Sequence, residues 1–344
     1  RDLIVTGVQT CALPISKGVP QGSVLGPLLF NIYVADLPAI AERNGTTLPS
    51  FADDMTMYCS DKSPASACQR VSRSLDALSE ALSVRGLSMN MDKTVSMLIR
   101  PRSLRQQELD VAPVVSCCGQ QVKMVSSTRL LGVTVDNTLC WSDHVDEVCK
   151  KVGRKIGALR RSFRQLSSNA RRLFLLSVIQ PDLEYAASVT VPTMSCQLRD
   201  RLLAVWRKAV RCAAGANWQD EVLPLLEELR ITPIKHRWIL QTAAIIRRCD
   251  MNCAPLPLCK KLKRTVHPHI TRGNRITFTP SLSSTQSGSV SFTKRAPLLW
   301  NSLKPEVQSA QSLGSFKSKL LLQLSCPTSS GQLCQLAFGN PSVQ

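Results

Sequence analysis

Two adjacent carboxylates, Asp53 and Asp54, are the residues of this chain best placed to do chemistry. They lie in the run Phe51-Ala52-Asp53-Asp54, and the apolar flanks of this run predict a β-hairpin over residues 49–59. Two aspartates in a tight turn can hold divalent metal ions, because carboxylate oxygens are hard ligands. Aspartate is also common in exposed turns that bind nothing, so the pair needs support from its surroundings.

A second motif, Gln21-Gly22-Ser23, precedes the aspartates by 32 residues. Gly22 permits close approach of a ligand to the backbone, and the amide of Gln21 can hydrogen-bond a nucleotide or a template base. The alternative is a loop that caps a core helix. A helix is expected directly afterwards, because Gly26-Pro27 is followed by apolar residues at helical spacing, namely Leu28, Leu29, Ile32 and Tyr33.

The elements that must position these motifs change in character along the chain. An amphipathic helix is expected over 64–84, extended structure over 87–99, and strands with turns at Gly119 and Gly132 over 111–135. From Trp141 onward helices dominate, with a first helix directly after Trp141 and further helices over about 169–179, 198–212 and 220–248. The first of these helices carries one apolar stripe of Val145, Val148, Val152, Ile156 and Leu159. The pattern predicts an α+β protein.

Charge and composition narrow the range of functions. The chain has 344 residues, is 44% hydrophobic, and carries 43 Lys and Arg against 24 Asp and Glu, a net charge of +19. Such an excess favours a polyanionic partner, most simply nucleic acid, although a basic surface without a partner is the alternative. No apolar run is long enough to span a bilayer, so we expect no membrane partner. The 14 cysteines follow no framework spacing, which favours an intracellular protein in the nucleus or cytoplasm, not a secreted one.

Taken together, the motifs resemble the reverse transcriptases of non-LTR (LINE-type) retrotransposons. The resemblance covers about residues 17–323 and is carried by the run from Gly18 to Pro38, by the two aspartates, and by three further kinds of motif. These are residues 86–94, residues 129–136, and the C-terminal runs 180–187, 300–303 and 316–320. It implies a partial polymerase palm over 17–136, a thumb-like basic helical region over 137–215 and a helical region over 216–265. A C-terminal extension with a Ser/Thr-rich loop over 266–323 and a disordered tail over 324–344 would follow.

The resemblance also assigns roles to residues. Asp53 and Asp54 would be catalytic and would hold metal, as part of a site for two Mg²⁺ ions. Gln21, Gly22 and Lys93 would bind the incoming nucleotide, although Lys93 without the resemblance is a solvated residue at a strand edge. Primer and template would be bound by Gly132, Lys150, Lys151, Arg154 and Lys155. The alternative for these four cations is the solvated face of an amphipathic helix.

The first catalytic aspartate of the family, and the fingers that clamp the triphosphate, would precede Gln21 and have no counterpart here. Asp2 is not assigned this role. Residues 5–15 back-translate into eleven consecutive codons of a common sequencing-library adapter. We therefore expect residues 1–16 to be an adapter artefact, which a genomic read through this junction would refute.

The expected function is that of an RNA-directed DNA polymerase, which uses an RNA template and a DNA primer. With two of three carboxylates, this chain is expected to be inactive by itself. The alternatives are a non-catalytic nucleic-acid-binding module and a decayed retroelement fragment. The sequence supports no expectation about the oligomeric state.

Overall fold

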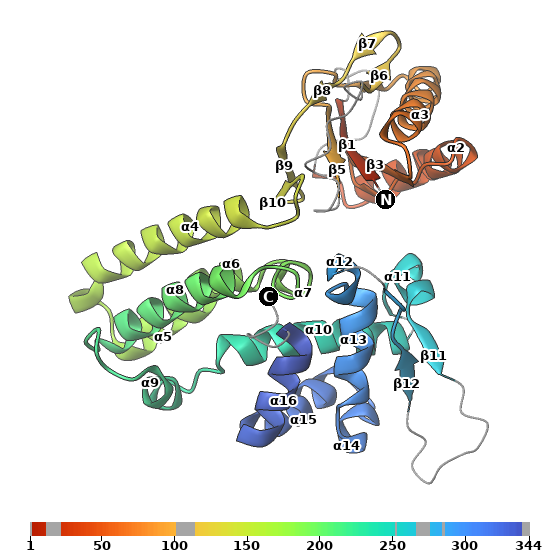
Figure 1. The fold of residues 1–344 in the computed structure, drawn as a ribbon. Helices are drawn as coiled ribbons and strands as arrows, with labels where there is room; N and C mark the ends of the chain where they lie inside the picture. Colours follow the sequence, from red (N-terminus) through yellow and green to blue (C-terminus); the bar gives the residue numbers. More distant parts are fainter. Residues whose placement is uncertain are drawn as a thin grey trace. The chain divides into compact units, whose positions relative to one another are not determined.

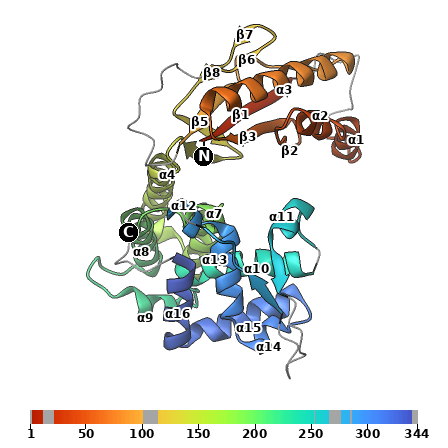
Figure 2. The same cartoon turned by 45° about the vertical axis from the view of Figure 1, so that its right-hand side comes forward.

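In a computed structural model the chain forms two units, which we call unit 1 (Arg1–Leu139) and unit 2 (Cys140–Gln344). The structure describes residues 2–11, 22–100, 114–251, 253–265, 276–283 and 286–338, and for residues 2–11 and 286–287 it describes only the backbone. Figures 1 and 2 show the ribbon from two directions. Unit 1 combines strands with helices and unit 2 is mainly helical, so the expected α+β class is confirmed.

The main sheet of unit 1 has the strand order β2-β3-β1-β5-β8. Its central strand is β1 (Asp2–Cys11), which pairs antiparallel with β3 (Asp54–Asp61) on one side and with β5 (Val95–Ile99) on the other. The short strand β2 (Ser50–Phe51) completes the hairpin with β3, and β8 (Lys123–Met124) runs parallel to β5. A sixth strand, β4 (Ser88–Met89), pairs with the end of β1. The expected hairpin and extended segments are therefore present.

The core of unit 1 forms where α3 (Pro64–Val84) packs on this sheet (Figure 1). Apolar residues of α3 recur every three or four positions, so they line one face of the helix, and that face is buried against Met55 and Met57 of β3. The start of α3 is fixed by Asp61, whose carboxylate accepts from the Ser63 N–H at 3.0 Å and from the Ser66 hydroxyl at 2.8 Å. Two further helices, α1 (Gly26–Tyr33) and α2 (Leu37–Arg43), precede the sheet hairpin.

Two small hairpins follow the sheet in unit 1. The first joins β6 (Ser116–Cys117) to β7 (Gln120–Gln121), and the second joins β9 (Ser127–Leu130) to β10 (Val133–Asp136). The turns fall at Gly119 and Gly132, both with positive φ, as the sequence predicts.

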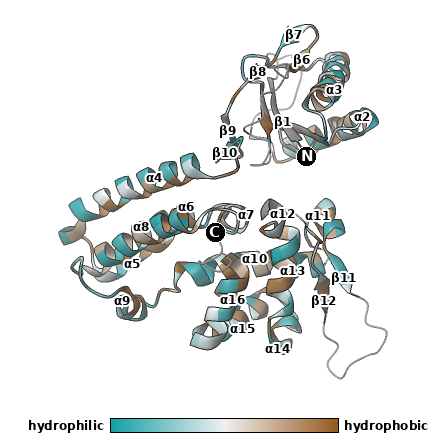
Figure 3. Cartoon of the chain, viewed as in Figure 1, coloured by the Kyte–Doolittle hydropathy of each residue, from teal (hydrophilic) through white to brown (hydrophobic). Residues whose placement is uncertain are grey.

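Unit 2 begins with two long helices, α4 (Ser142–Arg161) and α8 (Cys196–Ala214), which lie side by side (Figure 1). Both are amphipathic, and Figure 3 shows hydrophilic and hydrophobic residues alternating along α4. Five short elements connect α4 to α8. They are the 3-10 turn η2 (Phe163–Gln165), α5 (Ser168–Phe174), the π-helical turn η3 (Leu175–Ile179), α6 (Gln180–Glu184) and α7 (Ala187–Thr190). The expected helix over 169–179 does not stop before Pro181. The wide π-helical turn η3 accommodates a proline, which cannot donate a backbone hydrogen bond.

The rest of unit 2 gathers around α10 (Ile234–Asp250) (Figure 2). Its residue Trp238 is fully buried. The expected helix over 220–248 is interrupted, because α9 (Val222–Glu228) ends well before Pro233, the N-cap of α10. Around α10 lie α13 (Phe292–Asn301), α15 (Leu313–Ser325) and α16 (Pro327–Phe338). The remaining elements are α11 (Leu256–Lys261), β11 (Lys263–Thr265), β12 (Thr277–Thr279), α12 (Gln286–Ser289) and α14 (Pro305–Gln308).

Two expectations about the C-terminal part of the chain need correction. The extension is not purely helical, because β11 and β12 form an antiparallel pair. The disordered tail expected over 324–344 is wrong for residues 327–338, which form α16. Its residues Leu333, Ala337 and Phe338 are buried, and this burial stabilises a segment whose composition alone predicts disorder.

No helix among the described residues combines the length and the apolar character needed to cross a membrane. Every cysteine whose side chain is described is a free thiol.

Candidate active site

The two aspartates lie at the tip of the β2–β3 hairpin. Ser50 pairs with Met55 and Phe51 with Asp54, so Ala52 and Asp53 form a two-residue turn. Ala52 has a φ of 53°, the left-handed conformation that such a tight turn requires. Asp53 is exposed and Asp54 is half-buried. The turn therefore presents two neighbouring carboxylates, which fit as ligands for a divalent cation.

The register of the sheet brings Lys93 to the same end as the aspartates. Gly7 of β1 pairs with Thr56 on one side and with Val95 on the other. Asp54 and Lys93 each lie two residues before these partners, so both stand at the same edge with β1 between them. Since adjacent strands are about 4.8 Å apart, the two backbones are separated by roughly 10 Å at this edge.

Lys93 itself lies in the turn before β5 and is exposed. Its backbone N–H donates to the Asn90 carbonyl and to the Asn90 side-chain oxygen, both at 3.2 Å. These bonds fix the turn while leaving the lysine side chain on the surface. A long cationic side chain at this place suits an anionic group held near the aspartates.

A third carboxylate does not stand beside this pair on the neighbouring strand. In β1 the register partner of Asp54 is Gln9, and residues 3–11 contain no Asp or Glu. Asp2 pairs with Asp61, at the opposite end of β3. The register therefore agrees with leaving Asp2 without a catalytic role.

A different group of metal-ligand side chains was not anticipated from the sequence. Within the described part of the chain, three such ligand atoms come together only at Asp76, Cys117 and Cys118, all within 4.8 Å of one another. The Asp76 carboxylate accepts from the Cys118 N–H at 2.6 Å, and burial raises the pKa of Cys117 to about 12. The adjacent cysteines were the available sequence signal, but their proximity to α3 depends on the tertiary fold.

The expected nucleotide-binding motif is only partly visible. Gln21 lies outside the described residues. Gly22 is exposed with a φ of 81°, and a Cβ placed there would have no heavy atom within 4 Å. The backbone at Gly22 is thus open to approach, and its role in binding a nucleotide stays a prediction. Helix α1 follows as expected, but its apolar side chains Leu28 and Ile32 are exposed.

The hairpin expected to contact a primer is formed by β9 and β10. Leu131 and Gly132 form its two-residue turn with φ values of 46° and 81°. Positive φ at both positions is the type I′ pattern, in which glycine avoids the strain that an L side chain meets. The geometry of the turn therefore explains why a glycine stands at position 132. The contact of Gly132 with a primer remains a prediction.

The four cations expected on the thumb-like helix fall into two pairs. Lys151 and Lys155 of α4 both form ion pairs with Asp182 of α6, at 3.0 and 2.5 Å. Lys155 also donates to the Val178 carbonyl at 2.6 Å, so it joins α4 to the turn before α6. Lys150 and Arg154 are exposed one helical turn apart. The structure thus gives Lys155 a structural role that the sequence did not suggest.

Charge is divided very unequally between the units. Unit 1 contains 13 Lys and Arg against 12 Asp and Glu, a net charge of +1. Unit 2 contains 30 against 12, a net charge of +18. The candidate metal ligands therefore lie in a nearly neutral unit, and almost all attraction for a polyanion comes from unit 2.

Comparison with known proteins gives these features a context. Residues 3–135 match the family model described as reverse transcriptase (RNA-dependent DNA polymerase). The chain is 24% identical over 266 residues to the RNA-directed DNA polymerase from mobile element jockey of Drosophila melanogaster. This aligned region covers 75% of this chain and 28% of that protein. It is 26% identical over 213 residues to a putative 115 kDa protein in type-1 retrotransposable element R1DM of the same organism, covering 61% of this chain and 20% of the relative.

A third relative is the probable RNA-directed DNA polymerase from transposon X-element of Drosophila melanogaster. It is 23% identical over 227 residues, which covers 64% of this chain and 24% of that protein. The chain thus spans less than a third of the length of each of these relatives.

Proposed function

We propose that this chain, which belongs to the reverse transcriptases of non-LTR retrotransposons, contributes metal- and nucleotide-binding residues to RNA-directed DNA synthesis on an RNA template from a DNA primer. The observation that carries the proposal is the sheet edge that Asp53, Asp54 and Lys93 share, with β1 between the aspartates and the lysine. This edge combines ligands for a divalent cation with a cation suited to a triphosphate. We assign the same edge the binding of Mg²⁺.

Each residue has a distinct task in this proposal. Asp53 and Asp54 hold the metal at the tip of the hairpin, and Lys93 approaches the triphosphate from the neighbouring turn. A pair of Mg²⁺ ions bound there would supply activation of the primer 3′-hydroxyl and stabilisation of the departing pyrophosphate. The bare backbone of Gly22 permits close approach of the nucleotide. The assignment of Gln21 to the same nucleotide site rests on the sequence motif alone.

Metal binding can be tested without requiring catalysis. Mn²⁺ serves as the probe, because its free concentration is measured directly by electron paramagnetic resonance. We expect the whole chain to lower the free Mn²⁺ signal, and Asp53→Asn combined with Asp54→Asn to abolish most of this effect. Asp143→Asn, an exposed aspartate at the start of α4, is the matched control and should behave like the unaltered chain. Equal Mn²⁺ binding by the double variant and the unaltered chain would refute the site.

Catalysis is a separate readout. Because residues 3–11 of β1 supply no carboxylate beside Asp54, we expect this chain to extend no oligo(dT) primer on poly(rA) with Mg²⁺. Robust primer extension would contradict this expectation, although it would support the proposed function itself.

A second candidate function, nucleic-acid binding without catalysis, is favoured by the net charge of +18 in unit 2. Lysine and arginine bind the phosphate backbone without reading sequence and release its counterions. A gel shift that survives the double aspartate variant would support this function, and loss of Mn²⁺ binding by the same variant would still support the metal site. The free thiols and the nucleic-acid partner favour action inside the cell, in the nucleus or the cytoplasm.

A further inference from the structure

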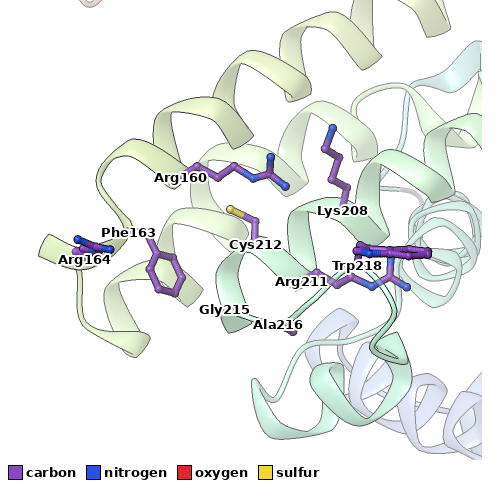
Figure 4. A pocket seen from close by; sticks show the side chains of 9 residues that line it. All are labelled: Arg160, Phe163, Arg164, Lys208, Arg211, Cys212, Gly215, Ala216 and Trp218. Atoms are coloured by element: carbon purple, nitrogen blue, oxygen red, sulfur yellow. The ribbon is translucent and has the colours of Figure 1, made fainter.

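A cavity of about 570 Å³ opens in unit 2 where α4, η2 and α8 end (Figure 4). Its volume lies within the range of ordinary small-ligand sites, roughly 300–1,000 Å³. Arg160 reaches into it from α4, and Lys208 and Arg211 reach into it from α8 (Figure 4). Phe163 and the loop after α8 complete its walls.

The lining of this cavity is strongly cationic. Four of its residues are basic and none is acidic, the basic ones being Arg160, Arg164, Lys208 and Arg211. Over the residues that the structure covers, no salt bridge engages any of these four side chains, whereas Lys151 and Lys155 share Asp182. Arg211 does donate to the Asp220 carbonyl at 2.8 Å, but no acidic side chain lines the cavity. Cations that lack an acidic counter-charge around one cavity favour an anionic ligand.

Helix stability alone does not account for all four charges. Basic residues in a last helical turn are favourable because they face the negative end of the helix dipole. That effect explains Arg160 at the end of α4 and Arg211 at the end of α8. It does not explain Lys208, which lies before the last turn of α8.

One wall of the cavity is held rigidly. The ring of Phe163 lies against Gly215, where a Cβ would stand only 2.7 Å from the Phe163 Cζ atom. The guanidinium of Arg171 also packs on this ring, 3.9 Å from the ring centroid. Arg171 is fixed in turn by its hydrogen bond to the Ala213 carbonyl at 3.1 Å. The aromatic wall is therefore preformed and does not need a ligand to order it.

Trp218 is the exception among the tryptophans of this chain. Its exposed fraction is 80%, whereas Trp141, Trp206, Trp238 and Trp300 are all buried. It borders the cavity beside Arg211 and leaves a large aromatic face available to solvent (Figure 4). Such a face, next to cations, is the combination that binds a base by stacking and its phosphate by charge.

We propose that this cavity binds an unpaired segment of nucleic acid, with one base stacked on Trp218 and phosphates held by Lys208 and, farther along the strand, by Arg164 (Figure 4). A duplex does not fit this chemistry, because its bases are already stacked on one another. The biological setting, an exposed stretch of RNA template or of nicked target strand, rests on the proposed function. The binding chemistry rests on the cavity alone.

Fluorescence anisotropy with short labelled oligonucleotides tests the proposal on the whole chain. Trp218→Ala should weaken binding of oligo(U) and oligo(dT) about five- to a hundred-fold, the range expected for loss of one stacked base. Trp218→Phe should retain most of the affinity. Arg164→Gln combined with Lys208→Gln should also weaken binding, whereas Arg207→Gln, an exposed neighbour outside the cavity, should have a smaller effect.

Three further arms sharpen the result. In the first, the affinity for a matched duplex should be nearly unchanged in Trp218→Ala. In the second, single strands should quench the tryptophan fluorescence of the unaltered chain, and they should quench that of Trp218→Phe much less. Competition by free dTTP distinguishes a mononucleotide site from a strand-binding one, because a strand-binding site should resist it. Unchanged single-strand affinity in Trp218→Ala, an equal loss for duplex, or full displacement by dTTP would overturn the proposal. The Mn²⁺ experiment probes unit 1 independently, so loss of either result leaves the other standing.

Discussion

At the scale of single residues, Cys326 differs chemically from the other cysteines. It is exposed just before α16, and hydrogen bonding from the Thr328 side chain, with further bonds from Ser329, lowers its pKa to about 7. Burial instead raises the pKa of Cys68 to about 11. Because the thiolate is the nucleophile, these two residues should differ widely in reactivity at neutral pH.

We predict that iodoacetamide alkylates Cys326 before the other cysteines at pH 7. Lowering the pH from 7 to 6 should slow this reaction about fivefold, and each further pH unit about tenfold, because the thiolate fraction falls in that proportion. Peptide mass mapping after short exposures measures the rates. Thr328→Val removes the first hydrogen bond, so it should raise the pKa and slow the reaction at pH 7. A pH profile centred near 8.5, as for an ordinary thiol, would contradict the prediction.

Some residue positions could be predicted from the sequence and others could not. The turn positions of the carboxylate pair and of Gly132 were predictable, because each depends on a local turn whose geometry its own neighbours specify. The ion pair that engages Lys155 was not, because Asp182 lies on another helix. The cavity beside Trp218 was missed for the same reason, since three separate segments form it.

At the scale of elements, Gly215 decides how α8 ends. It caps the helix with a φ of 76° and lets the Phe163 ring pack directly on the backbone. Gly153 lies in the middle of α4, and a Cβ added there would have no neighbouring heavy atom within 4 Å. The two glycines therefore offer a matched pair for the same substitution.

We predict that Gly215→Ala lowers the free energy of unfolding by about 1–3 kcal/mol, from left-handed strain and from the clash with Phe163. Gly153→Ala should raise it by roughly 0.5–1 kcal/mol, because glycine weakens a helix interior. Urea denaturation followed by circular dichroism measures both. A change of the same sign in the two variants would show that the end of α8 does not depend on this packing.

Helices with strong local periodicity were the elements that the sequence specified well. The apolar residues of α3 and the stripe of α4 recur every three or four positions, so their buried faces follow from the sequence. Helix α16 was missed because it depends on distant partners. Phe338 packs edge-on against Trp238 with ring centroids 6.0 Å apart, and its carbonyl accepts from Arg199 at 2.6 Å. The helix propensity of residues 327–338 does not indicate these contacts, because the partner residues lie far away in the sequence.

At the scale of the whole molecule, the separation of charge governs how the chain meets a polyanion. The net charge is +18 in unit 2 and +1 in unit 1, so attraction to phosphates and the candidate metal ligands belong to different units. Carboxylates in a strongly positive unit would be drawn toward its own lysines and arginines. A nearly neutral unit surrounds them with fewer competing lysines and arginines than unit 2 would.

Salt dependence separates cations that contact phosphates from those engaged within the fold. Arg154 and Lys151 are both exposed on α4, but only Lys151 forms an ion pair with Asp182. We predict that Arg154→Gln reduces the slope of log affinity for nucleic acid against log salt concentration by about 0.7–0.9, the value for one lost phosphate contact. Lys151→Gln removes the same formal charge but should change the slope much less, because its ammonium is already partly neutralised. Anisotropy titrations of the whole chain over a series of KCl concentrations give both slopes. Equal reductions in the two variants would mean that net charge, and not the exposed face of α4, determines the binding.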